Sequence, residues 1–163
     1  MTTFRHAVRA LIVDESDHVL LCRFDLVDTA GKVILAAPGG GIEPGESLLA
    51  ALTRELREEI GLELDGLDPR HLWNQQVEDP RYAPGFDGVI NDHFVLKVRR
   101  FEARGAMTDE ELAAENVTEF RWWSLKELEE YDGEALFSPR ALPRLYRDYL
   151  EQGVPAEPRR LGV

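Results

Sequence analysis

One apolar stripe of helical period constrains the fold of this chain more than any other feature of its sequence. Leucine or isoleucine recurs every fourth residue across 48–60, which places these side chains on one face of an α-helix. Ser47 or Glu46 can start such a helix, and Gly61 is a natural stop. We therefore predict an amphipathic helix over residues 47–60.

The segments around this helix are apolar in the manner of β-strands. Runs at 7–14 and 18–24, separated by a short polar stretch, predict a hairpin. Further strands are expected at 32–37, 71–77, 89–101 and 119–123. Loops are expected at 25–31, at the glycine run Gly39-Gly40-Gly41, and at 108–114 with a short helical turn.

Two more helices are expected near the carboxyl end. Ser124 is a plausible N-cap with Glu127 at the capping-box position. A last helix is predicted over 139–151, with a buried side formed by Leu142, Leu145, Tyr146 and Tyr149. Strands flanked by helices predict an α/β or α+β sandwich in a single domain over 1–152. Residues 153–163, which include two prolines, are expected to form a loose tail.

The outer face of the predicted 47–60 helix is rich in acids. Glu55, Glu58 and Glu59 lie within about one helical turn, so their carboxylates can converge on one spot. Like charges at these spacings cost a helix a few tenths of a kcal/mol per pair, and a divalent cation would remove that cost. Ligands that are all oxygen suit magnesium or manganese. A solvated acidic face is the ordinary alternative, and the helix alone leaves both open.

A glycine loop before the helix adds a second signal. The run Gly39-Gly40-Gly41 is followed by another acid, Glu46, and such a backbone can closely approach a phosphate or a metal. Taken whole, residues 40–62 resemble the Nudix box, written G-x5-E-x7-R-E-U-x-E-E-x-G-U with U aliphatic. Every fixed position is filled. Seven specified residues, each at a background frequency near ~7%, arise by chance about once in 10⁸ starts.

The resemblance implies a fold, a reaction and residue roles. The fold is the Nudix α/β/α sandwich, with a mixed sheet flanked by helices. The reaction is magnesium-dependent hydrolysis of a diphosphate linkage in a nucleoside diphosphate joined to another moiety, by attack of a metal-activated water at phosphorus; manganese could replace magnesium. The implied metal ligands are the Gly39 carbonyl, Glu55, Glu58 and Glu59. Arg54 would orient these carboxylates with Glu46 as its partner, and the same pair would form a salt bridge between loop and helix.

The attacking water needs a proton acceptor. The resemblance offers Glu58, or a glutamate in a loop shortly before a late strand. Glu115 has that placement, and Glu110, Glu111 and Glu119 lie close enough to be alternatives. The residues expected to contact substrate are Arg23, Gly40, Gly41, Trp73 and Phe86. Tyr82 and Trp122 could also stack on a base, although core packing is the commoner role of aromatic residues. No subgroup marker identifies the nucleotide.

Composition restricts the partners. A formal net charge of −12 argues against an extended nucleic acid, but a bound cation would still admit a small phosphorylated substrate such as a nucleotide. No apolar run approaches the ~20 residues that span a bilayer, and no signal-peptide stretch follows the first residues. Cys22, the only cysteine, lies in an apolar run and is expected to be a buried thiol. We expect a cytoplasmic protein without membrane contact.

Two classes of function fit this sequence. The first is a Nudix-type pyrophosphohydrolase. The second is a non-catalytic nucleotide-binding or regulatory module on the same fold. Such modules usually lose acids of the box, and here every acid is present, which favours the enzyme. The resemblance also makes a homodimer plausible.

Overall fold

Two long strands from distant parts of the chain form the centre of the sheet. In the computed structural model, which describes residues 1–26 and 32–163, β1 (Phe4–Val13) pairs in parallel with β6 (Gly88–Lys97). The register runs without a break from Phe4 opposite Gly88 to Val13 opposite Lys97. Alternate residues of β1 face opposite sides of the sheet, so both sides of this pair are available for packing.

The other strands extend the sheet on both sides of this pair. They are β2 (Val19–Leu26), β3 (Lys32–Ala36), β4 (Gly39–Gly41), β5 (Arg70–Val77), β7 (Val117–Trp123), β8 (Leu136–Ser138) and β9 (Arg159–Leu161). Their order is β8-β3-β2-β1-β6-β5-β9, with β4 also on β1 and β7 also on β2. β1 and β2 pair at the tip of their hairpin, where Val13 lies opposite Val19, and farther along β1 the antiparallel partner is β4.

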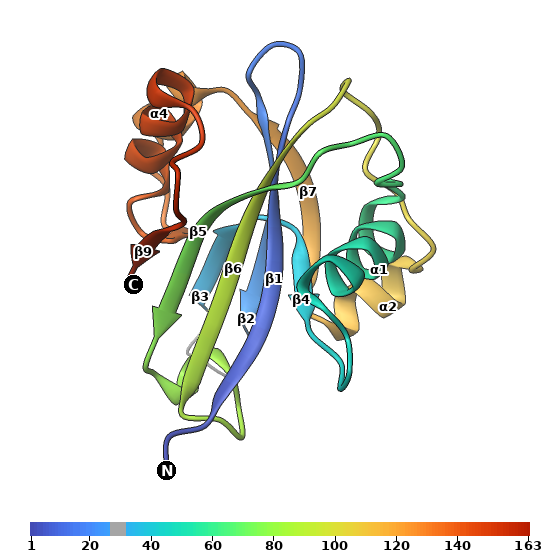
Figure 1. The fold of residues 1–163 in the computed structure, drawn as a ribbon, viewed down its shortest axis with the longest axis vertical. Coiled ribbons are helices and arrows are strands. Elements are labelled where there is room, and N and C mark those ends of the chain that lie inside the picture. Colours follow the sequence, from blue (N-terminus) through green and yellow to red (C-terminus); the bar gives the residue numbers. More distant parts are fainter. Residues whose placement is uncertain (27–31) are drawn as a thin grey trace.

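Helices cover both faces of the sheet. α1 (Leu48–Ile60) and α2 (Asp109–Ala114) lie together on one side and α4 (Leu142–Gln152) lies on the other (Figure 1). α3 (Leu125–Glu130) and a 3₁₀ turn over Pro80–Tyr82 complete the elements. The side chains of α1 at 52, 56 and 60 are fully buried, and α4 buries the four side chains predicted for it. The predicted α/β/α sandwich is therefore confirmed. Among the described residues, no helix is long and apolar enough to cross a membrane.

The helix predicted over 47–60 is confirmed together with its caps. The Ser47 side chain accepts a hydrogen bond from the Ala50 amide, 3.1 Å away. Gly61 ends the helix in the left-handed conformation, with φ at 72°. Beyond it, the backbone amides of Arg104 and Met107 donate to the carbonyls of Ile60 and Glu58 at 3.1 and 2.9 Å. The last turn of α1 is thus fastened to the segment that follows β6.

Several local expectations need correction. The glycine run was expected to interrupt regular structure, but it is extended and pairs with β1. A Cβ atom at Gly39 would stand 2.0 Å from the Val8 carbonyl oxygen, so only glycine allows this approach. The tail over 153–163 is not loose throughout, because Arg159–Leu161 pairs with β5.

Other helices and strands differ from the prediction only in where they begin or end. The strand predicted to run to residue 101 ends at Lys97, and the turn expected within 108–114 is α2, with Thr108 as its N-cap. The predicted loop over 25–31 lies mostly outside the described residues, and its first two residues belong to β2. The capping box of Ser124 with Glu127 and the burial of Cys22 are confirmed.

Candidate active site

The acids of α1 do not share one environment. Glu59 is 1% exposed and Glu55 is 8% exposed, and both line a pocket of about 430 Å³. The Glu58 side chain is 44% exposed and is absent from the described lining of that pocket. Two of the three predicted carboxylates are therefore brought together inside the protein, and the third stands nearer to solvent.

This pocket is built from segments that are far apart in the sequence. Residues of β1 and the glycine run belong to its lining, and α1 supplies the two buried acids. Residues of β2 and β3 also belong to the lining, together with Tyr82 and Phe86 from the segment 81–86. Glu115, at the C-cap of α2, and Asn116 line it as well. The pocket thus combines carboxylates, arginines and aromatic rings.

Burial and mutual repulsion act on the acids of the pocket. Removal of water, together with the charges of Glu55 and Glu115, raises the pKa of Glu59 to about 8. Arg9 and the Gly39 amide, which donates to Glu59 Oε2 at 3.3 Å, oppose that rise. Burial likewise raises the pKa of Glu55, against the effect of the adjacent Arg54. Three carboxyl groups that interact through space are thus concentrated in one pocket.

Arg54 joins the glycine loop to the helix. Its Nε and Nη2 atoms donate to the two carboxylate oxygens of Glu46 at 2.9 and 2.8 Å. Nη1 donates to Glu55 at 2.8 Å, and Nη2 also donates to the Gly41 carbonyl at 3.0 Å. These hydrogen bonds from Arg54 hold the pKa of Glu46 down to about 2. The predicted contact between Arg54 and Glu46 is present, and it extends to a pocket acid.

The glycine loop lies directly against the acids. A Cβ atom at Gly40 would stand 2.5 Å from the carboxyl carbon of Glu55. Any side chain at this position would displace the carboxylate, so the close approach of backbone to acid depends on glycine. All three glycines of the run line the pocket.

The chemistry of these donors suits a hard divalent cation. Buried, mutually repelling carboxylates lose most of their electrostatic cost when such an ion joins them, and oxygen ligands match magnesium or manganese. Across residues 1–26 and 32–163, no group of three or more histidine, cysteine, aspartate or glutamate side chains is already arranged to hold a metal ion. The donors present therefore fit such an ion by their chemistry, with Glu55 and Glu59 buried together in one pocket.

Two residues expected to contact substrate lie elsewhere. Trp73 is 2% exposed and packs in the core on the α4 side. Arg23 pairs with Asp25 at 3.1 Å and lines a separate small hollow with Glu119. Both residues therefore lie outside the described lining of this pocket, because alternation along a strand does not tell which face meets the pocket. Phe86, by contrast, lines it.

The sequence reasoning missed several pocket residues. They are Arg5, Arg9, Phe24, Arg81 and Asn91. Arg9 carried a usable signal, since it is a charged residue in the middle of an apolar strand. Such a residue must find a polar partner or face a cavity. The alternatives to Glu115 separate clearly: Glu111 belongs to the capping box of α2, and Glu110 and Glu119 are outside the described lining of the pocket.

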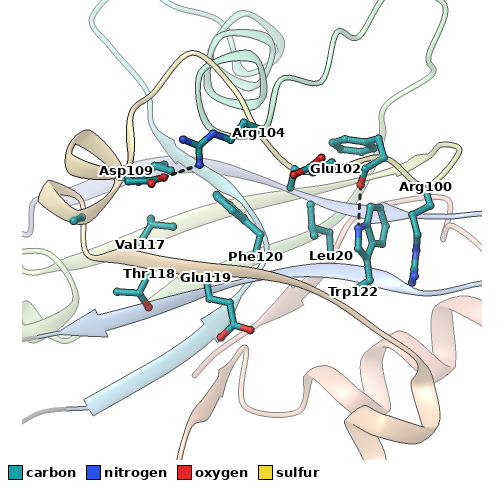
Figure 2. A pocket seen from close by; sticks show the side chains of 14 residues that line it. Leu20, Arg100, Glu102, Arg104, Asp109, Val117, Thr118, Glu119, Phe120 and Trp122 are labelled. Atoms are coloured by element: carbon teal, nitrogen blue, oxygen red, sulfur yellow. Dashed lines mark hydrogen bonds and ion pairs between the residues drawn. The ribbon is translucent and has the colours of Figure 1, made fainter.

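A larger cavity does not share this chemistry. It measures about 830 Å³ and lies between β7, α2 and the segment 100–104 (Figure 2). Its lining mixes apolar and charged residues and includes Phe120 and Trp122, whose indole N–H donates to the Phe101 carbonyl at 3.3 Å. None of the box glutamates is among its described lining residues. Chemistry rather than volume thus identifies the smaller pocket as the candidate active site.

Solved structures of other proteins share this fold. The chain resembles the solved structure of a MutT protein from Methanosarcina mazei Go1, at 22% identity and a TM-score of 0.62, covering 93% of this chain and 96% of that one. A NUDIX hydrolase from Nitrosomonas europaea gives 22% identity and a TM-score of 0.63, covering 93% and 91%. The NUDIX domain of Shewanella oneidensis NrtR, solved with ADP ribose, gives 19% and 0.62, covering 92% and 90%.

These identities are low, so the structural likenesses establish the fold alone. A search of curated proteins gives no match. The family model described as the NUDIX domain, however, matches residues 3–145, which is most of the chain and contains the whole pocket lining. The chain therefore belongs to the Nudix family of hydrolases.

Proposed function

We propose that this protein hydrolyses a diphosphate linkage in a small phosphorylated substrate, with magnesium or manganese as its cofactor. The observation that carries the proposal is the buried pair Glu55 and Glu59. Both carboxylates are repelled by the charge of Glu115, and the pocket that holds all three also contains arginines. A pocket with this charge pattern suits a cation and an anion bound side by side. A diphosphate with a divalent ion is such a pair.

The proposed ligands of the cation are Glu55, Glu59, Glu58 and the Gly39 carbonyl. When bound, the ion would neutralise diphosphate oxygens and lower the pKa of a water molecule at phosphorus. Arg54 holds Glu55 in position and ties it to the loop through Glu46. Glu115 is proposed to accept the proton of the attacking water, because it lines the same pocket from the end of α2, whereas the carboxylates proposed to bind the cation come from α1. Glu58 is the alternative acceptor.

A nucleotide is the proposed class of substrate. Phe24, Tyr82 and Phe86 give the pocket aromatic surface on which a base could stack. The NrtR domain, which has the same fold, was solved with ADP ribose. That complex supports a nucleotide in this pocket and also a second candidate function, nucleotide binding without hydrolysis. The complete set of box acids favours hydrolysis.

A substrate panel tests this function. Nucleoside triphosphates, nucleotide sugars, dinucleotides and a non-nucleotide diphosphate are incubated with magnesium, and phosphate-containing products are identified by phosphorus NMR. Hydrolysis of at least one of these compounds is expected, and the same reaction with excess chelator should yield no product. Full turnover in chelator would rule out the metal mechanism. Tight nucleotide binding with no product across the panel would support the binding module instead.

We also propose that the protein is located in the cytoplasm. A buried single thiol is compatible with the cytoplasm, where thiols stay reduced. A homodimer stays a prediction from the family resemblance, and light scattering on the purified protein measures it.

A further inference from the structure

Two arginines of the pocket differ from most others in this acidic protein. Exposed arginines commonly pair with a carboxylate, as Arg57 does with Glu63 and Arg104 with Asp109. Arg5 and Arg9 both line the candidate active site. Within residues 1–26 and 32–163, neither makes an ion pair with an acidic side chain.

Arg9 is held firmly by neutral groups. Its Nη1 donates to the Ala37 carbonyl at 3.0 Å, and its Nε donates to Asn91 Oδ1 at 3.3 Å. Its guanidinium carbon stands 5.4 Å from the ring centroid of Phe24. A guanidinium has five N–H donors, and among the described residues no acceptor is recorded for those on Nη2. The side chain is therefore fixed in orientation and keeps donors to spare.

The surroundings of Arg9 make its charge costly. The residue is partly buried, and the loss of surrounding water lowers the pKa of its guanidinium. Glu59 is the strongest attractive charge that acts on it, but its carboxylate already accepts from the Gly39 amide and repels other acids. A charge that has lost water without gaining a direct ion pair is unfavourable. An anion that enters the pocket would remove this cost.

Arg5 extends the same feature along β1. It precedes Arg9 by four residues, so both side chains emerge on one face of the strand. The Arg5 guanidinium lies over the glycine loop, since a Cβ atom at Gly41 would stand 2.9 Å from its Nη2. Its positive charge also reaches Arg9. The two arginines thus form one basic strip beside the acids of α1.

We propose that Arg9, with Arg5 beside it, binds the phosphate oxygens of the substrate that face away from Glu55 and Glu59. Planar guanidinium forks match phosphate oxygens in geometry and charge. The third arginine of the described lining, Arg81, already pairs with Asp79. This inference rests on the proposed function, because the anion is the substrate's own diphosphate. Arg9 would bind the ground state and the transition state alike, so its loss would raise KM more than it lowers kcat.

Methylenediphosphonate tests the subsite without turnover, because its P–C–P bridge cannot be hydrolysed. Its affinity is measured by calorimetry with magnesium present, for the wild type, Arg9→Met and Arg9→Lys. Charge-assisted hydrogen bonds of this kind correspond to roughly 10- to 100-fold in affinity. We expect Arg9→Met to weaken binding by that factor and to raise KM similarly, with Arg9→Lys between it and the wild type. Arg70→Met is the matched control, since Arg70 is well exposed and outside the described pocket lining.

The outcomes separate cleanly. Arg9→Met binding within about twofold of the wild type overturns the subsite, as does an equal loss in Arg70→Met or a wild type that does not bind the probe. If Arg9→Met does not fold, Arg9→Lys decides: it keeps the charge but loses the fork, so unchanged affinity overturns the proposal and a loss beyond about threefold supports it. A wild type that binds the probe through Arg9 yet hydrolyses no diphosphate would refute the proposed function and leave the anion subsite standing.

Discussion

Arg54 donates two hydrogen bonds to the carboxylate of Glu46, at 2.9 and 2.8 Å, and its third guanidinium nitrogen donates to Glu55 at 2.8 Å. One guanidinium thereby connects the end of the glycine loop to an acid inside the pocket. The loop and the helix are consecutive in sequence, and this contact adds a second connection between them. The arrangement makes Arg54 a positioning residue for the pocket.

A double-mutant cycle tests that position. Arg54→Ala should lower the melting temperature and reduce turnover, but less than loss of Glu59 does. Glu46→Ala should have a smaller effect of the same kind, and the double variant should be no worse than Arg54→Ala, because both changes remove one contact. Thermal unfolding and initial rates of all four proteins give the coupling. Strictly additive losses would show that the two residues act independently.

The pH range of this contact follows from the pKa of Glu46. Hydrogen bonds from Arg54 lower that pKa from 4.5 to about 2, so the carboxylate is bound more tightly in the folded state than in the unfolded chain. Its stabilisation is fully present above the unfolded value and is lost as the pH falls toward about 2. The difference in melting temperature between wild type and Glu46→Gln should therefore persist at pH 5 and shrink below about pH 4. A difference that disappears already at neutral pH would contradict the contact.

Glu59→Gln should separate stability from activity. Glu59 is buried beside Glu55 and close to Glu115, so removal of its charge should raise the melting temperature in chelator. The same change should reduce turnover by roughly 100-fold or more, because it deletes a proposed ligand of the cation. Glu63→Gln, near the end of the same helix and largely exposed, is the control. Wild-type turnover in Glu59→Gln would show that Glu59 is not needed for the reaction.

The proton acceptor is tested by Glu115→Gln. We expect kcat to fall by roughly 10²–10⁴, with KM little changed, because the group acts in the transition state. Glu110→Gln, Glu111→Gln and Glu119→Gln should stay near the wild type, since none of these residues belongs to the described lining of the pocket. Steady-state kinetics on the best panel substrate decide this. If none of the four changes kcat, Glu58 becomes the acceptor.

What the sequence predicted well was local. The α1 helix depends on a repeating stripe of 13 residues and on the two caps Ser47 and Gly61, so its limits could be predicted from neighbouring residues alone. The family resemblance pointed to an acid shortly before a late strand, and the structure puts that residue, Glu115, in the pocket lining. Its role, like those of the box glutamates, stays a prediction.

What the sequence missed depends on distant partners. The pairing of β9 with β5 and of β4 with β1 joins segments whose own patterns are polar or glycine-rich. Trp73 and Phe86 could not be distinguished beforehand, because only the tertiary structure decides which aromatic residue meets the core. The orientation of the Arg9 side chain depends on hydrogen bonds to Ala37 and Asn91, which lie far from it in the sequence.

The segment that fastens the end of α1 has a consequence for protein engineering. Arg104 and Met107 bind the last carbonyls of the helix, and a Cβ atom at Gly105 would stand 2.3 Å from the Glu58 carbonyl oxygen. Two residues after Met107 the chain enters α2, which ends at Glu115. This link therefore fixes the distance between Glu59 on α1 and Glu115 at the end of α2. A single inserted residue at 104–108 would change the spacing of the two acids, whereas a change of length at 81–86 would leave this connection intact.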